Sequence, residues 1–204
     1  MNKTINRKRI IAYLLDIILV YMLISAIVSI RFLNPNYDKY IDSYEKYIDI
    51  FEDYSKGHIT EKEYTKLNTN NIINVTKYSI SSNIVIILVI IGYFVFFQKY
   101  NNGQTLGKKI KKIKVVSNDN KKLTLKNYFL RILPLYYIFI GGIIPIIISS
   151  ILVFILPAKI YITVNSLIIY AFFILATISF AMAFRREDKR TMHDILANTK
   201  VVEE

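Results

Sequence analysis

The feature that most constrains the fold of this chain is a basic, glycine-punctuated segment flanked by long apolar runs. The segment covers residues 103–131 and reads GQTLGKKIKKIKVVSNDNKKLTLKNYFLR. Ten basic residues lie between residues 99 and 131, and Asp119 is the only acid among them. The flanking runs are too long and too poor in charge for a soluble core, so the segment must lie between membrane spans. Because cytoplasmic loops carry an excess of Lys and Arg, we expect it on the cytoplasmic side.

Four apolar runs are candidates for membrane spans, at residues 10–33, 80–97, 132–156 and 164–184. The first would measure roughly 36 Å as a helix, enough to cross a hydrocarbon core of about 30 Å. Basic residues precede the first run and follow the last, which places both termini in the cytoplasm. We therefore expect a multi-pass protein of the cell membrane, and the Ile, Asn and Lys usage suggests a bacterial source.

The hydrophilic stretch at residues 34–79 predicts a helical hairpin on the outer side. Its acids outnumber its bases, which suits that side. Apolar and aromatic side chains recur at helical spacing up to Gly57, and Thr60 with Glu63 matches a capping box that opens a second helix. The chain is then a single membrane domain, 1–204, made of the four spans, this insert, a cytoplasmic loop at 98–131 and a cytoplasmic tail at 185–204.

Short β-prone segments in the cytoplasmic parts predict a small sheet. Residues 114–117 and 122–124 flank a turn-forming Asn-Asp-Asn-Lys run, which predicts a hairpin. Residues 200–202 are also β-prone, and we expect this tail strand to pair with the hairpin so that Val115 lies near Val201. The fold class is an all-α integral membrane protein with four transmembrane helices, a small cytoplasmic β-hairpin or sheet and an extracytoplasmic helical hairpin.

Several function classes are excluded by composition and motifs. The net charge of +12 lies beside membrane spans, where topology accounts for it, so we expect no nucleic-acid partner. The absence of cysteine excludes disulfides, thiolate metal sites and thiol nucleophiles. The chain contains no HExxH or GxSxG motif, and residues 103–108 are too short for a phosphate-binding loop. We predict no enzyme activity, no cofactor and no metal.

An acid within the first span is the leading candidate for a functional residue. Asp16 lies about 9 Å along the helix from Ile10, in the inner half of the bilayer. A carboxylate facing lipid there costs roughly 2.5–3.5 kcal/mol, so Asp16 should face other helices or water. One interpretation is that Asp16 orients the helix by pairing with a neighbouring base. The other is a proton or cation site, with Arg9 two turns below on nearly the same face.

A candidate helix break lies within the third run, at Gly141, Gly142 and Pro145. Proline removes the backbone hydrogen bond to the carbonyl of Gly141 and should kink or break the helix. In a transporter, such breaks expose backbone groups to ions. Kinks are also common in ordinary spans, so both interpretations stay open.

Three separated pieces of the chain resemble one family. They are RIIAYLLD at residues 9–16, GQTLGKKIKKIKVV at residues 103–116, and RTMHDILANTKVV at residues 190–202. In order and spacing they are similar to the motifs of RDD-family membrane proteins. By that resemblance, the arginine and the two aspartates that name the family are Arg9, Asp16 and Asp194.

The same resemblance implies further cytoplasmic motif residues, namely Gly103, Gln104, Thr105, Gly107, Lys108, Arg131 and His193. Asn120 and Asn198 stand where the family usually places glycine, and Asn can also adopt the left-handed conformation. We expect His193 and Asp194 near the inner mouth, close to Arg9 and Asp16. The alternative for Asp194 is a helix cap or an ion pair with a lysine.

The resemblance implies a membrane protein for which cation/proton exchange is suggested in some members. The leading interpretation is a small transporter that uses Asp16 as ion or proton carrier, and that assembles as a homo-oligomer because four spans enclose little space. The alternative is a non-transporting accessory protein whose basic cytoplasmic face binds a partner or the anionic headgroups of membrane lipids. The two differ at Asp16→Asn, which should abolish activity in a folded carrier but lower abundance or assembly in an accessory protein.

Overall fold

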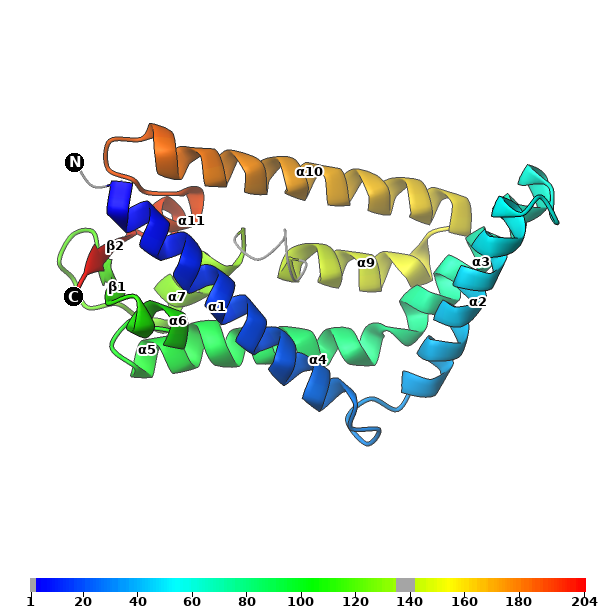
Figure 1. The fold of residues 1–204 in the computed structure, drawn as a ribbon, viewed down its shortest axis with the longest axis horizontal. Helices are drawn as coiled ribbons and strands as arrows, with labels where there is room; N and C mark the ends of the chain where they lie inside the picture. The colour runs from blue at the N-terminus through cyan, green and yellow to red at the C-terminus, as the bar shows by residue number, and fades with distance from the viewer. Residues whose placement is uncertain (1–2, 135–141) are drawn as a thin grey trace. The chain divides into compact units, whose positions relative to one another are not determined.

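Helices make up most of the chain in the computed structural model, which describes residues 3–134 and 142–204 (Figure 1). The chain divides into two compact units. Unit 1 comprises Met1–Ser25, Ile87–Ile144 and Tyr170–Glu204, and unit 2 comprises Ala26–Ile86 and Pro145–Ile169. The N-terminal and C-terminal segments thus belong to the same unit as the central basic loop.

Three of the described helical segments are long and apolar enough to cross a membrane. The first is α1 (Lys3–Val28), and the last is α10 (Ala158–Arg185). Between them, α4 (Ile80–Ile91), the π-helix η1 (Gly92–Phe97) and α5 (Gln98–Tyr100) form one continuous segment. These helices cover the predicted spans at 80–97 and 164–184 and most of the span at 10–33, where α1 ends five residues early, at Val28. The prediction of a helical, multi-pass membrane protein is therefore supported.

The predicted span at 132–156 is not one continuous helix. The helix α7 (Leu125–Ile132) ends where that span should begin, and the apolar helix α9 occupies Ile143–Ile155. With 13 residues, α9 measures about 20 Å, which is shorter than a hydrocarbon core of about 30 Å. The structure therefore contains, among its described residues, three helices of spanning length and a shorter apolar fourth.

The interruption of the predicted span lies before α9, where Gly142 is not helical, and Pro145 does not break α9 itself. It is the third residue of α9 and lies in the first turn, where a missing N–H breaks no hydrogen bond within the helix. Gly142 directly precedes α9 and is buried. Gly141, the third member of the predicted break, lies outside the described residues.

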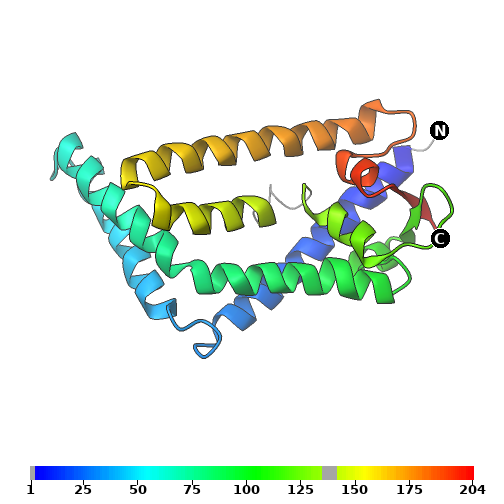
Figure 2. The ribbon, with the colours of Figure 1, turned by 180° about the vertical axis from the view of Figure 1, so that it is seen from behind.

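Unit 2 contains the predicted helical hairpin. Helices α2 (Tyr37–Ser55) and α3 (Glu61–Tyr78) lie side by side in both views (Figures 1 and 2). Gly57 in the turn has a φ of +74°, which favours glycine. Thr60 and Glu63 form the capping box, with the Thr60 N–H donating to Glu63 Oε2 at 2.9 Å. The two helices and the capping box of this insert are therefore as predicted, and its position on the outer side stays a prediction.

Unit 1 contains a two-stranded antiparallel sheet of described residues, formed by β1 (Ile113–Ser117) and β2 (Thr199–Glu203). Val115 lies opposite Val201, which confirms the predicted pairing of the tail with the loop. The beginning of α1 lies near β2 in both views (Figures 1 and 2), and Lys8 Nζ is 3.0 Å from Glu203 Oε1.

The predicted hairpin within the loop is wrong, because residues 122–124 form no strand. β1 places Ile113 and Val115 on a buried face. The segment after the turn begins with two exposed lysines and has no valine pair to cover that face, whereas β2 has one. Asn120 and Asn198 have φ values of 60° and 50°, which confirms the left-handed turns expected there.

Candidate functional site

Asp16 on α1 holds the central loop through hydrogen bonds. Its side chain is 1% exposed. Tyr93 Oη donates to Oδ1 at 2.7 Å, Thr105 Oγ1 donates to Oδ2 at 2.5 Å, and the backbone N–H of Gly107 donates to Oδ1 at 2.8 Å. The expectation that Asp16 faces the protein interior is confirmed. Its carboxylate ties α1 to η1 and to the loop that leads into α6 (Leu106–Ile110).

At Gly103 and Gly107 of the central loop, a side chain would collide with the backbone of neighbouring elements. A Cβ atom on Gly107 would lie 2.1 Å from the carbonyl oxygen of Ala12 and 2.8 Å from Asp16 Oδ1. Gly103 has a φ of +82°, and a Cβ there would lie 2.4 Å from the carbonyl oxygen of Val115. The loop motif therefore packs its backbone directly against α1 and β1.

Thr105 and Lys108 complete this part of the site. Thr105 caps α6, and its Oγ1 accepts from the Lys108 N–H at 3.4 Å. Lys108 Nζ also donates to Thr105 Oγ1 at 3.2 Å and lies 3.9 Å from Asp16 Oδ2. Burial, together with the positive charges of Arg131 and Arg9, lowers the pKa of Lys108 to about 8 against the attraction of Asp16.

A second carboxylate, Asp194, is shared by two arginines. Arg9 Nη2 lies 2.6 Å from Asp194 Oδ2, and Arg131 Nη1 donates to Asp194 Oδ1 and to Thr199 Oγ1. Asp194 is fully buried, and Arg131 is 5% exposed. Arg9 Nη1 also donates to the carbonyl oxygen of Lys189 at 2.7 Å. The predicted proximity of Asp194 to Arg9 is confirmed.

Asp194 also caps the short helix α11 (Met192–Leu196). The backbone N–H and the hydroxyl of Thr191 donate to Asp194 Oδ2 at 3.1 and 2.8 Å. The helix-cap alternative is thus correct, but the partners of the ion pairs are arginines rather than a lysine. Burial by itself raises the pKa of Asp194, but the positive charges of Arg131 and Arg9 outweigh it and hold this pKa well below its ordinary value.

His193 and Gln104 have structural partners. His193 is 4% exposed, and its Nδ1 lies 2.8 Å from Thr191 Oγ1. Burial lowers the pKa of His193 to about 3 against the attraction of Asp194, so the imidazole is neutral at neutral pH. Gln104 Nε2 donates to the carbonyl oxygen of Ile113 and to Glu204 Oε2, both at 3.1 Å, which joins β1 to the C-terminus.

Sequence reasoning missed the partner of Asp16 on η1 and the hydroxyl partner of Arg131. Tyr93 is one of several aromatic residues near the end of its span, and the sequence does not distinguish it from Phe94 or Phe97. Thr199 lies in the tail strand, far from Arg131 in sequence. Only the tertiary fold brings these groups together.

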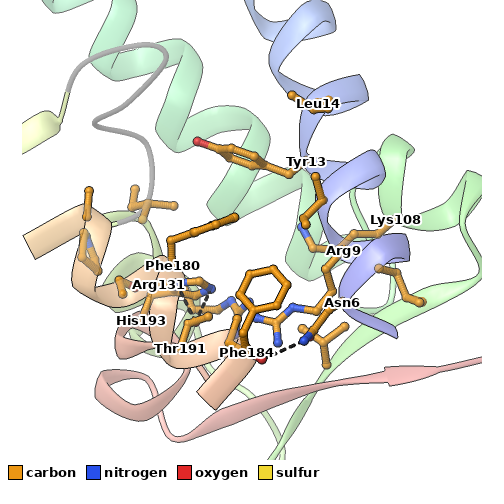
Figure 3. A pocket seen from close by; sticks show the side chains of 18 of the residues that line it. Asn6, Arg9, Tyr13, Leu14, Lys108, Arg131, Phe180, Phe184, Thr191 and His193 are labelled. Carbon is orange, nitrogen blue, oxygen red and sulfur yellow. Dashed lines mark hydrogen bonds between the residues drawn. The ribbon is translucent and has the colours of Figure 1, made fainter. Parts of the chain in front are cut away.

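A cavity of about 470 Å³ lies in unit 1 next to the arginine pair (Figure 3). Its polar wall includes Arg9, Lys108 and Arg131, and its apolar wall includes Phe180 and Phe184 of α10. Among residues 3–134 and 142–204, no group of three or more His, Asp or Glu side chains could hold a metal ion. The site therefore combines a cationic wall with an apolar one.

Comparison with known proteins identifies the family to which these motifs belong. The model of the RDD family matches residues 6–198, nearly the whole chain. No curated protein and no solved structure matches the chain. The matched range includes Arg9, Asp16 and Asp194, so the resemblance of the three separated pieces is confirmed.

Proposed function

Because the chain belongs to the RDD family and carries membrane-spanning helices, we propose that it is a non-transporting membrane accessory protein whose basic cytoplasmic face binds anionic lipid. The observation that carries this proposal is the coordination of Asp16. Two hydroxyls and one backbone N–H, all from the protein, donate to its carboxylate. A carboxylate with these partners stabilises the loop, whereas an ion carrier must exchange its partners during each cycle.

The exposed lysines of the loop support lipid as the partner. Five lysines between residues 109 and 126 of the central loop are exposed, namely Lys109, Lys112, Lys121, Lys122 and Lys126. Lysines next to a membrane span are attracted to the negative surface of the cytoplasmic leaflet. Asp16 and Asp194 fix the loop and the tail to the helices, so they hold these charges near that surface.

A topology with four crossings is part of the proposal. The paired strands β1 and β2 must lie on one side of the membrane, because a hydrogen-bonded sheet cannot be divided across it. The chain between them contains α10, which is long enough to cross once. A second crossing is then needed between residues 132 and 158, and α9 with its flanking residues would supply it. Both termini and the basic loop would face the cytoplasm of a bacterial cell.

Cation/proton transport is the second candidate, and the environment of Lys108 favours it. Its ammonium group lies 3.9 Å from Asp16, and burial lowers the pKa of Lys108 to about 8. A lysine with such a pKa can exchange a proton near neutral pH, next to an acid in a span. Assembly as a homo-oligomer, expected because four spans enclose little space, stays a prediction.

Cation-driven proton flux in proteoliposomes distinguishes the two candidates. The proposal predicts no flux above protein-free vesicles for the wild type with Na⁺, K⁺ or Li⁺. It also predicts that Asp16→Asn lowers thermal stability in detergent, because the substitution replaces a hydrogen-bonded carboxylate with an amide that offers fewer acceptors. Asp188→Asn, at an exposed ion pair with Arg186, is the matched control and should behave as wild type.

Transport would instead be supported by wild-type flux that disappears in a stably folded Asp16→Asn protein. That result would contradict the accessory proposal. Matched incorporation of the three proteins, checked by gel after flotation of the vesicles, makes the fluxes comparable.

A further inference from the structure

The cavity of unit 1 has a cationic end and an apolar end, both built from buried or half-buried side chains. At the cationic end lie Arg9, Lys108 and Arg131, and no carboxylate lines the cavity among the described residues. Arg9 and Arg131 share the carboxylate of Asp194, and Lys108 lies 3.9 Å from that of Asp16. Three cations thus face two carboxylates, so the group carries a net positive charge. Such a wall attracts an anion.

The apolar end is formed by the two membrane-spanning helices α1 and α10. Ile10 and Leu14 line it from α1, and Ala176, Phe180 and Phe184 line it from α10 (Figure 3). Leu14, Phe180 and Phe184 are 42%, 53% and 48% exposed, so this wall reaches the surface that a bilayer covers. An apolar chain can therefore enter the cavity directly from the lipid.

An unsatisfied acceptor also lines the cavity. Asn6 is 7% exposed and lines the cavity, and its Nδ2 donates to the carbonyl oxygen of Ala183 at 2.7 Å. Its Oδ1 is buried and has no hydrogen-bond partner within the described part of the chain. A buried acceptor without a donor costs free energy, so a ligand with a hydroxyl donor fits this position.

At the cationic end, some N–H donors of Lys108 and Arg131 have no acceptor within the described residues. Within the described residues, the Lys108 ammonium donates one hydrogen bond, to Thr105. Between described residues, Arg131 donates two hydrogen bonds, both from Nη1, so within that part of the chain its other nitrogens can serve a further acceptor. Arginine presents several N–H groups in a planar fork that suits phosphate oxygens.

We propose that this cavity binds one anionic phospholipid with a hydroxyl-bearing headgroup. Its phosphate lies at Arg9, Lys108 and Arg131, a headgroup hydroxyl donates to Asn6 Oδ1, and an acyl chain lies along α1 and α10. A volume of about 470 Å³ holds a headgroup and the first part of a chain. Basic pockets between spans on the cytoplasmic side are suited to such headgroups. This inference rests on the proposed binding of anionic lipid, and it assigns that binding to a defined cavity.

The test is native mass spectrometry of the purified full-length protein titrated with phosphatidylglycerol or phosphatidylcholine. The wild type should retain one phosphatidylglycerol at concentrations about tenfold below those needed for phosphatidylcholine. Lys108→Met, which removes a buried cation but keeps a long side chain, should weaken retention about tenfold. Ala176→Phe should abolish retention by filling the apolar end. Leu175→Phe is the matched control, since Leu175 is exposed on α10 and lies outside the cavity lining.

Other outcomes would overturn the assignment. Equal retention of the two lipids, or equal loss in Leu175→Phe and Ala176→Phe, would show that the cavity does not select an anionic lipid. Competition by millimolar inorganic phosphate, with Ala176→Phe unaffected, would identify a free-phosphate site instead. Retention that is lost in a Lys121→Gln/Lys122→Gln variant but kept in Lys108→Met would contradict the cavity while leaving the proposed surface binding intact. Thermal melts of every variant exclude unfolding as the cause.

Discussion

At the scale of single residues, the site is organised by two buried carboxylates with different kinds of partner. Asp16 accepts hydrogen bonds from hydroxyls and a backbone N–H, whereas Asp194 neutralises two guanidinium groups. Gly107 lies in contact with the first of these carboxylates. The absence of its side chain is what allows the loop to reach α1.

Gly107→Ala should lower the stability of the protein. The added Cβ would lie 2.1 Å from the Ala12 carbonyl oxygen, so the loop must move away and lose its hydrogen bond to Asp16. We expect a loss of about 1–3 kcal/mol, measured as a lower melting temperature in detergent. Gly92→Ala is the control, since a Cβ at Gly92 meets nothing within 4 Å. Equal melting temperatures for the two variants would contradict the close packing of the loop.

At the scale of elements, the short helix α11 is held in place by its own capping residue. Asp194 caps the helix and contacts α1 through Arg9 and α7 through Arg131. Arg131 also donates a hydrogen bond to Thr199 at the start of β2. One carboxylate thus links α11 to two helices and, through that arginine, to the sheet.

Asp194→Asn should detach α11 and destabilise the protein by about 3–5 kcal/mol, because the buried Arg131 and the partly buried Arg9 lose their counter-charge. Since the pKa of Asp194 in the folded protein lies well below its ordinary value, this contribution is fully present above pH of about 4 and is lost as the pH falls through the folded pKa. Melting temperatures of wild type and variant should therefore differ most at pH 5–8 and converge in stronger acid.

Asp188→Asn provides the control for this experiment. Asp188 pairs with Arg186 at the surface, where solvent screens the interaction, so its removal should change the melting temperature little. A pH-independent difference between wild type and Asp194→Asn, or an equal effect of Asp188→Asn, would contradict the role of Asp194 as counter-charge.

At the scale of the whole molecule, the pairing of β1 with β2 constrains how many times the chain crosses the membrane. The loop and the tail belong to one unit, and α10 ends next to the tail. An even number of crossings must separate the two strands. If α10 supplies one crossing, a second crossing is needed before it, and the described apolar helix in that part of the chain is α9.

Single cysteines introduced into this cysteine-free chain would test the four-crossing topology. If the proposed topology holds, Lys62→Cys in the helical insert and Lys159→Cys at the start of α10 should react with a membrane-impermeant maleimide on intact cells. Lys121→Cys in the loop should react only after lysis. All three positions are exposed, so burial does not limit labelling. Labelling of Lys159→Cys only after lysis would contradict the second crossing between residues 132 and 158.

The sequence by itself determined the membrane class, three of the helices that can span, the helical insert with its capping box, and the pairing of Val115 with Val201. These features depend on local composition, periodicity and turn chemistry, which a single chain displays directly. The acid within the first span drew attention to Asp16 and the neighbouring Arg9, and family resemblance added Asp194 to them. Only the tertiary structure decided their partners, because Tyr93, Thr105 and Arg131 reach these carboxylates from distant elements. It also decided that residues 122–124 form no strand, since they lack the valine pair that β2 presents beside the buried side of β1.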